Sequence, residues 1–457
     1  MLTVRIDNQA HLGPLSELPG QVATQIRDRL TFQNPAHQEA EWRGYWTGNI
    51  PKEIVGYQVV GGELTVARGF TRQLIQILKT AGVQYHLDDQ RRTLPEVDFT
   101  FNADLWDFQV EALEAIKARD SGTMGAPTGS GKTVVALALI AKRRQPALVV
   151  VHNKELQDQW VNRIETFLGI PAGEVGRIGG GKQIIGDKIS VALVQSLYKC
   201  AGEIAPYVGF LIVDEAHRCP SRTFTEAVTA FDCRYMLGLS ATPWRRDGLS
   251  RLIYWYLGDK VHEVDKEALV DGGHVLEAEV IWRETNFEPT YDASEEYSRM
   301  LSELTQDPER NSLIADDVAQ EVGNGSGVCL VLSDRKAHCE ALVDLLEARG
   351  IEAALLTGDL SPGQRQGVVT ALNAGQIKVL VATGQLIGEG FDYRELRTLF
   401  LATPIKFNGR LIQYLGRVLR PAPGKAQAMV FDYHDVHVGV LMAAAQARAR
   451  VYGPQGE

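Results

Sequence analysis

A glycine-rich segment at residues 126–133, which reads Ala-Pro-Thr-Gly-Ser-Gly-Lys-Thr, constrains this chain more than any other feature. A run able to form a short strand, Ser121–Gly125, precedes the segment, and an apolar run suited to a buried helix, Val134–Ile140, follows it. Glycines let backbone N–H groups converge on a phosphate without Cβ clashes, and the helix N-terminus adds positive potential there. This order of elements predicts a P-loop. The alternative is a glycine-rich turn before a core helix, since Ala126 stands where the pattern has its first glycine.

The individual positions of the loop predict a nucleotide site that holds ATP and Mg²⁺. Lys132 is expected to reach the β- and γ-phosphates, and the Thr133 hydroxyl to ligate Mg²⁺. The remaining residues expected around the phosphates are Thr128, Gly129, Ser130 and Gly131.

Composition narrows the class of protein. A length of 457 residues suggests about three domains. The net charge of −10 excludes a protein that coats nucleic acid through bulk charge, so any such contact must be local. The five cysteines are scattered without a Cys-x-x-Cys pair, which favours reduced thiols over metal ligands. The start lacks a signal-peptide pattern and no apolar run approaches the roughly 20 residues that span a bilayer, so we expect a cytoplasmic protein without a membrane partner.

Residues 1–100 are predicted to form a small α+β accessory domain. Two strand-like runs, residues 53–60 and 63–67, flank a Gly-Gly pair that suits a tight hairpin, and a helix is expected from about Gly69. Residues 35–50 contain His37, Trp42, Tyr45 and Trp46. Aromatic side chains can stack on bases, but a domain core with a surface histidine is the interpretation that we favour for this cluster.

Two α/β regions follow and predict parallel sheets. Residues 101–275 contain short Val-, Ile- and Leu-rich runs that alternate with helical patterns, as in strands buried on both faces. Residues 311–457 repeat this rhythm and end in a further helix. Residues 276–310 are expected to form a connector or a small insertion.

An acidic pair, Asp214-Glu215, follows the apolar run Phe210–Val213 and continues as Ala216-His217. Downstream of a P-loop, such a pair has a clear use: Asp214 would hold Mg²⁺ through water, and Glu215 would polarise the attacking water.

With the P-loop before it and Leu-Ser-Ala-Thr-Pro at residues 239–243 after it, Asp-Glu-Ala-His resembles the DEAD/DEAH-box helicases and translocases of superfamily 2. Further segments of the chain also resemble motifs of this family, in the family's order. They are Phe108-Gln109 (the adenine-reading element), residues 149–156 (motif Ia), residues 194–197, residues 330–335 (motif IV), residues 381–392 (motif V) and residues 413–420 (motif VI). The resemblance spans residues 105–432 and is most similar to the XPB-type DNA helicases, with phage branched-DNA helicases also similar. Arg246 departs from the acidic residue of that group's Arg-Glu-Asp element.

The resemblance implies two tandem RecA-like lobes with ATP between them. Gln109 would read adenine, Gly390 and Asp392 would contact the nucleotide, and Arg417 and Arg420 would act as arginine fingers. The residues that would couple hydrolysis to the nucleic acid are His217, Ser240, Thr242 and Gln413. The residues that would contact nucleic-acid phosphates are Asn153, Gln195, Ser196, Ser333 and Thr383.

The implied activity is an ATP-dependent DNA helicase that moves 3′ to 5′, in repair, recombination or processing of branched DNA. The expected partner is a single-stranded tracking strand within forked or branched DNA, bound by a monomer; no motif identifies a regulatory protein. The alternatives are a double-stranded DNA translocase that never separates strands, an RNA helicase, and a nucleic-acid-binding module with an inactive ATPase.

Overall fold

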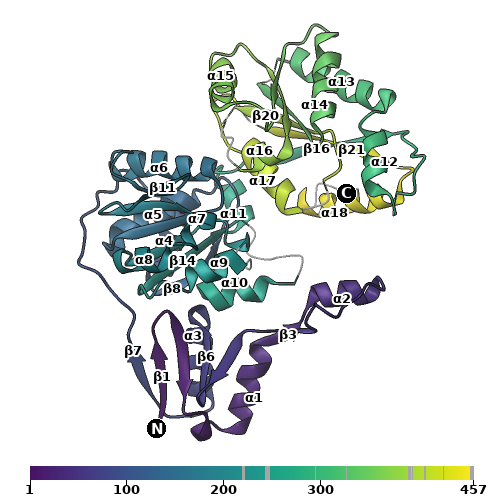
Figure 1. Cartoon of the computed structure of the whole chain (residues 1–457). Helices are drawn as coiled ribbons and strands as arrows, with labels where there is room; N and C mark the ends of the chain where they lie inside the picture. Colours follow the sequence, from purple (N-terminus) through teal and green to yellow (C-terminus); the bar gives the residue numbers. More distant parts are fainter. Residues whose placement is uncertain are drawn as a thin grey trace. The chain divides into compact units, whose positions relative to one another are not determined.

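The computed structural model describes residues 1–452 apart from residues 219–221, 242–247, 294, 326, 390–392, 394, 406–407 and 426. The chain divides into two compact units, Met1–Ala126 with Gly131–Val264, and Pro127–Ser130 with Asp265–Glu457. We call residues 1–100 the N-terminal region, residues 101–264 the first lobe and residues 265–452 the second lobe. Figure 1 labels the elements of each. Within the described part of the chain, we find no helix with the length and apolar character needed to cross a membrane.

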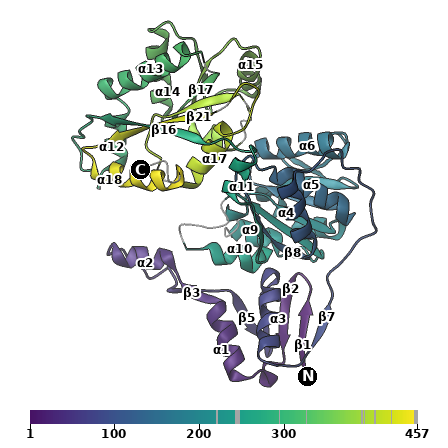
Figure 2. The same cartoon turned by 180° about the vertical axis from the view of Figure 1, so that it is seen from behind.

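The N-terminal region has a five-stranded sheet in the order β5-β6-β2-β1-β7. Its strands are β1 (Leu2–Ile6), β2 (Gln9–Gly13), β5 (Tyr57–Val60), β6 (Glu63–Ala67) and β7 (Tyr85–Asp89). Helices α1 (Gly20–Arg29) and α3 (Thr71–Thr80) lie side by side and share the apolar core of this sheet (Figure 2). The predicted hairpin is confirmed as β5–β6, with Gly61 and Gly62 at φ angles of 60° and 83°. The sequence patterns did not predict β1, β2 or α1.

The core of the N-terminal region continues into the first lobe. Trp255, from α10 (Ser250–Leu257), belongs to the same buried cluster as Val4 and Phe70. Gly69 has no room for a Cβ, which would meet the backbone of Trp255 and Gly258. We predicted a separate accessory domain, but the N-terminal region shares its core with the first lobe. Removal of the region would therefore expose Trp255 to solvent.

A two-stranded antiparallel ribbon, β3 (Thr31–Gln33) and β4 (Glu53–Val55), leads to and from α2 (Pro35–Trp42). We call residues 31–55 the arm. Its aromatic side chains Trp42, Tyr45 and Trp46 are exposed, whereas His37 is buried. The favoured prediction of an aromatic core with a surface histidine was therefore wrong.

The first lobe has an eight-stranded sheet in the order β11-β10-β12-β9-β13-β14-β8-β15. All neighbours are parallel except the β10–β11 pair. The strands are β8 (Ser121–Gly125), β9 (Ala147–Val151), β10 (Gly176–Gly179), β11 (Lys182–Ile184), β12 (Ile189–Leu193), β13 (Phe210–Val213), β14 (Tyr235–Ser240) and β15 (Lys260–Glu263). The helices, besides α10, are α4 (Asp107–Lys117), α5 (Lys132–Arg143), α6 (Lys154–Leu168), α7 (Val194–Leu197), α8 (Ala201–Ile204) and α9 (Arg222–Val228).

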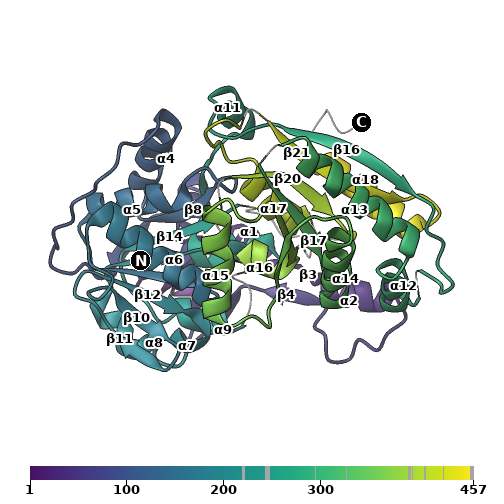
Figure 3. The ribbon, with the colours of Figure 1, turned by 90° about the horizontal axis from the view of Figure 1, so that it is seen from above.

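The second lobe has a six-stranded parallel sheet in the order β16-β21-β20-β17-β19-β18. The strands are β16 (Ala278–Thr285), β17 (Val328–Ser333), β18 (Ala353–Leu356), β19 (Val379–Thr383), β20 (Leu396–Leu401) and β21 (Ala428–Asp435). The helices are α11 (Lys266–Asp271), α12 (Tyr297–Leu304), α13 (Pro308–Gly323), α14 (Lys336–Glu347), α15 (Pro362–Asn373), α16 (Gly384–Glu389), α17 (Asn408–Val418) and α18 (Gly439–Tyr452). Helices α13 and α14 lie on one face of the sheet, and α17 and α18 on the other, as the side view shows (Figure 1); seen from above, these layers overlap (Figure 3).

Residues 276–310, for which we predicted a connector or a small insertion, begin with β16. β16 pairs in parallel with β21 over its whole length, from Ala278 beside Ala428 to Thr285 beside Asp435. The segment therefore supplies an edge strand of the second sheet. Its mixed polar and apolar residues did not predict a strand in the sequence.

Candidate nucleotide site and nucleic-acid contacts

The predicted P-loop joins β8 to α5. Gly129 and Gly131 have φ angles of 93° and 81°, the left-handed region that a side chain disfavours. Helix α5 begins at Lys132, whose Nζ donates a hydrogen bond to the Ala126 carbonyl at 2.9 Å. Thr133 follows in the first turn and is half-buried. The loop thus places a lysine and a helix N-terminus together, which is the chemistry that a triphosphate requires.

Gln109 lies against this loop. Its Oε1 accepts a hydrogen bond from the backbone N–H of Trp106 at 3.1 Å, which fixes the side chain at the start of α4. A Cβ on Gly131 would collide with the Gln109 amide nitrogen, so only glycine allows this approach. The predicted adenine-reading residue and the phosphate-binding residues therefore lie in one site.

Asp214 and Glu215 follow the carboxyl end of β13. The P-loop follows the carboxyl end of β8 in the same parallel sheet. Trp160 of α6 donates its indole N–H to Asp214 Oδ2 at 2.8 Å, and the Glu215 backbone N–H donates to Asp214 Oδ1 at 2.9 Å. Glu215 has a φ angle of 52°, a left-handed conformation that is uncommon for a residue with a side chain. Such strain at a functional position is maintained by the surrounding structure.

The electrostatics of the two carboxylates differ. Burial, followed by the charge of Glu215, raises the pKa of Asp214. Burial also opposes ionisation of Glu215, but the hydrogen bond from His217 and the charge of Lys132 prevail and lower the pKa of Glu215. Lys132 therefore acts on both acids, and Glu215 ionises more readily than Asp214.

Ser240 connects these parts, because β14 lies between β13 and β8 in the sheet. Its backbone carbonyl accepts from the Ala126 N–H at 3.0 Å, at the start of the P-loop. Its hydroxyl lies 3.2 Å from His217 Nδ1, which is also 3.2 Å from Glu215 Oε2. Ser240 and His217, for which we predicted a coupling role, thus join the acidic pair to β14, the strand that leads into the Leu-Ser-Ala-Thr-Pro segment at residues 239–243 (motif III).

The residues fit Mg²⁺-ATP. Glu215 Oε2 is a buried carboxylate oxygen that lies 3.2 Å from His217 Nδ1, and a carboxylate oxygen can also accept a hydrogen bond from a water at the phosphates. The Thr133 hydroxyl and the Asp214 carboxylate supply the hard oxygen ligands that Mg²⁺ prefers.

Helix α17 of the second lobe carries Gln413 and Arg417, and Arg420 follows its end. Positions 413, 417 and 420 share one face at helical spacing. Lys425 donates to the carbonyls of Val418, Arg420 and Leu396, so it satisfies the end of the helix that positions both arginines. Burial and the charges of Arg397 and Arg420 lower the pKa of Lys425 to about 8.

The predicted phosphate contacts form two groups. Asn153 follows β9, Gln195 and Ser196 follow the neighbouring β12, and Gln195 Nε2 donates to the His152 carbonyl at 3.1 Å. In the second lobe, Ser333 and Thr383 are paired across β17 and β19. The Ser333 hydroxyl is buried and lies 2.9 Å from His338 Nδ1, so its geometry suits an internal support better than a phosphate contact.

Three predicted site residues, Thr242, Gly390 and Asp392, lie outside the described residues, as does Arg246. Two residues with clear places in the site were missed. Trp160 lies among the buried residues of α6, and a buried indole N–H needs an acceptor and so indicates a polar neighbour. Lys425 follows the motif VI segment without any pattern that distinguishes it.

Two family models match the chain, "Type III restriction enzyme, res subunit" over residues 102–245 and "Helicase conserved C-terminal domain" over residues 314–422. The protein named "Probable helicase D10" of Escherichia phage T5 is 28% identical over 387 residues, which cover 84% of this chain and 82% of the phage protein. "DNA 3′-5′ translocase XPB2" of Sulfurisphaera tokodaii is 36% identical over 166 residues, or 36% of this chain and 37% of that protein. "Putative DNA 3′-5′ helicase Rad25" of Haloarcula marismortui is 24% identical over 369 residues, or 79% of this chain and 57% of that protein.

The solved structure of the Pyrococcus furiosus Hef helicase domain shares the fold, with a TM-score of 0.51 and 15% identity over 74% of this chain and 97% of that chain. Fold and site together define an ATP-hydrolysing enzyme of the helicase type, with two RecA-like lobes. The chain belongs to superfamily 2 of the helicases, and XPB-, Rad25- and phage-type helicases are among its relatives.

Proposed function

We propose that this protein is a DNA-dependent ATPase that moves 3′ to 5′ along one strand and separates duplex DNA. The observation that carries the proposal is the hydrogen-bonded series that links Ala126 of the P-loop through Ser240 and His217 to Glu215. Such a series relates the nucleotide site to the motif III strand. The names of the Rad25-type and XPB2 relatives support DNA and the 3′-5′ direction.

Each nucleotide-site residue has a distinct role in the proposal. Bound Mg²⁺-ATP supplies the phosphoanhydride and the metal that neutralises its charge. Lys132 stabilises the β- and γ-phosphates, while Thr133 and Asp214 hold the metal. Glu215 orients and deprotonates the attacking water, which its lowered pKa permits because the carboxylate stays ionised. Arg417 and Arg420 stabilise the charge that develops on the transferred phosphoryl group.

The nucleic-acid contacts in this proposal are polar and do not read sequence. Asn153, Gln195 and Ser196 lie at the ends of adjacent strands and offer short polar side chains to phosphates. Local contacts of this kind are compatible with a net charge of −10, since they do not depend on a basic surface.

A strand-displacement assay tests the proposal. Duplexes with a 3′ or a 5′ single-stranded tail are incubated with ATP, and release of the labelled strand is measured. We expect release from the 3′-tailed duplex, weaker release from the 5′-tailed duplex, and none with Glu215→Gln. Preference for the 5′ tail would contradict the direction, and release that matches RNA duplexes better than DNA would contradict the substrate.

A second candidate is a translocase on double-stranded DNA that does not separate strands, favoured by the name of the XPB2 relative. Displacement of a triplex-forming oligonucleotide from duplex DNA distinguishes it. A wild-type protein that displaces the third strand but releases no strand from either tailed duplex would support the translocase and exclude the helicase.

A further inference from the structure

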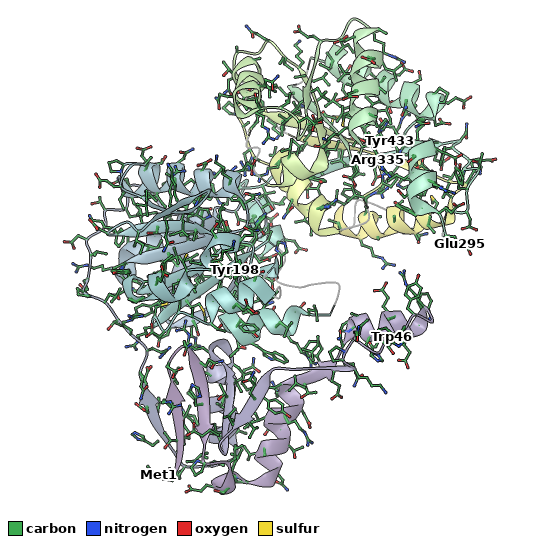
Figure 4. All side chains as sticks on the ribbon, in the orientation of Figure 1. Met1, Trp46, Tyr198, Glu295, Arg335 and Tyr433 are labelled. Atoms are coloured by element: carbon green, nitrogen blue, oxygen red, sulfur yellow. The ribbon has the colours of Figure 1, made fainter. Side chains whose placement is uncertain are left out.

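The arm presents an unusual surface. Trp42, Tyr45 and Trp46 are 85%, 65% and 75% exposed, more than any other aromatic side chain in the described part of the chain. Figure 4 labels Trp46 on this arm, beyond the ribbon that leads to α2. Exposed Trp side chains gathered in one place typically mark a binding surface, because leaving them in water is unfavourable.

The aromatic residues are exposed although the arm is well ordered by hydrogen bonds. Asn34 caps α2, since its Oδ1 accepts from the Ala36 N–H at 3.1 Å and its Nδ2 donates to the Pro51 carbonyl at 2.9 Å. At the other end, Gly44 adopts a φ of 69° and the Tyr45 N–H donates to the Ala40 carbonyl at 2.8 Å. The ring positions are therefore prepared before any ligand binds, which reduces the entropic cost of binding.

The root of the arm is attached to the first lobe. The Phe32 ring meets Trp255 of α10 edge to face at 5.5 Å between centroids, and the Arg251 guanidinium lies 5.6 Å from the Phe32 ring centre. A Cβ on Gly248 would lie 3.0 Å from Pro35 Cγ, so the start of α2 adjoins the segment that follows motif III in sequence. The root of the arm is thus packed against the lobe that carries the P-loop.

The charge of the arm indicates which ligand it fits. Within residues 35–50 the charged side chains are Glu39, Glu41 and Arg43, and Arg43 pairs with Glu39 at 2.7 Å. A phosphate-binding surface would be basic, whereas this surface complements an uncharged aromatic face. A helix that docks in a protein groove would show aliphatic residues at i, i+3 and i+4, and α2 contains no Leu, Ile or Val.

We propose that Trp42, Tyr45 and Trp46 form a stacking surface for unpaired nucleobases, so that the arm holds the single-stranded part of the DNA next to the first lobe. This inference rests on the proposed DNA helicase function and adds a binding surface that the superfamily motifs do not contain. Base stacking on aromatic side chains tolerates any sequence, because every base has a π-face.

Fluorescence polarisation on the full-length protein tests the proposal with labelled single-stranded, forked and blunt duplex DNA. The variant is Trp42→Ala/Tyr45→Ala/Trp46→Ala, and the control is Tyr207→Ala, which removes an aromatic ring that is 59% exposed elsewhere in the first lobe. We expect the triple variant to bind single-stranded and forked DNA about tenfold more weakly or worse, with blunt duplex binding unchanged. The slope of affinity against salt should stay the same, because no phosphate contact is removed.

DNA with abasic sites tests whether the affinity depends on the bases themselves. Replacing the bases of the single-stranded region by abasic sites should lower the affinity of the wild type to that of the triple variant, while the variant itself loses little. Trp42→Phe/Trp46→Phe should retain most of the affinity, because the π-faces remain.

Equal weakening on blunt duplex, or additive effects of the variant and the abasic sites, would overturn the proposal. Unchanged binding to every DNA would also overturn it. If the wild type hydrolyses ATP in a DNA-dependent manner and separates strands in any of these cases, the proposed function stands and only the arm proposal fails.

Discussion

The two lobes have similar parallel sheets, but they support their site residues in different ways. In the first lobe, Asp214, His217 and Ser240 are held by hydrogen bonds among neighbouring strand ends, and the ion pair Arg177–Asp158 lies at the surface. In the second lobe, the ion pairs Arg310–Asp435 and Arg448–Asp432 are almost completely buried.

The difference in supporting contacts indicates that the two lobes contribute differently to the activity. The first lobe holds the residues that we propose to bind the phosphates, whereas the second lobe holds α17, which carries Arg417 and is followed by Arg420. Helix α18 packs against α17 and is joined to β21 by the Arg448–Asp432 pair. Substitutions in the first lobe should therefore alter chemistry, and those in the second lobe should alter stability or the position of the arginines.

The largest effect is expected for Arg417→Ala. If this arginine acts only in the transition state, kcat for ATP hydrolysis should fall by about 10³–10⁵ while ATP affinity stays close to that of the wild type. Steady-state kinetics and binding of a fluorescent ATP analogue measure the two quantities. Arg299→Ala, at an exposed pair in the same lobe, is the control. An equal loss of affinity would show that Arg417 binds the ground state instead.

Arg448→Ala should destabilise the second lobe by about 3–5 kcal/mol, because it leaves the buried Asp432 carboxylate without its partner. Arg177→Ala should cost less than about 1 kcal/mol, since its pair with Asp158 is exposed. Hydrogen–deuterium exchange measured by mass spectrometry should report faster exchange in β21 and α18 only for Arg448→Ala. Similar exchange in both variants would remove the contrast between the lobes.

Trp160→Phe should reduce kcat/KM for ATP by about tenfold, the equivalent of one hydrogen bond to a charged group. The indole N–H favours the ionised form of Asp214, so its loss should raise the pKa of Asp214 further. The acidic limb of the pH profile should then move to higher pH, because Asp214 stays protonated to a higher pH. A lower maximal kcat/KM with an acidic limb at unchanged pH would show that Trp160 contributes only through packing.

Lys425→Met should have the smallest effect, a reduction of kcat by about fivefold at unchanged stability of the first lobe. The substitution removes the donor to the Val418 and Arg420 carbonyls but keeps an unbranched side chain of similar length. Lys425→Arg should retain part of the activity. A change in KM for ATP without a change in kcat would argue against a role in positioning the arginines.

The sequence was most informative where function depends on short segments. The pattern of glycines, lysine and threonine in residues 126–133, and the apolar run Phe210–Val213 before Asp214 and Glu215, allowed the P-loop and the acidic pair to be located before the fold was seen. Contacts between distant residues could not be located in this way, because only the fold brings together Trp160 with Asp214 in the first lobe and Arg310 with Asp435 in the second.

The N-terminal region shows where the sequence-based expectations were wrong. Hydrophobic residues are expected in a core, and this expectation misplaced Trp42, Tyr45 and Trp46, which the arm exposes. The burial of Trp255 under β-strands of residues 1–100 was equally hidden, since its neighbours lie about 200 residues away in sequence.

The central claim, that DNA binding controls ATP hydrolysis at the Lys132–Glu215 site, is tested most directly by steady-state ATPase measurements with and without single-stranded DNA. We predict that DNA raises the wild-type rate severalfold, and that Glu215→Gln lowers the DNA-stimulated rate by about 10²–10⁴ while DNA binding is retained. A wild-type rate that does not respond to DNA, or a Glu215→Gln rate equal to that of the wild type, would contradict the claim.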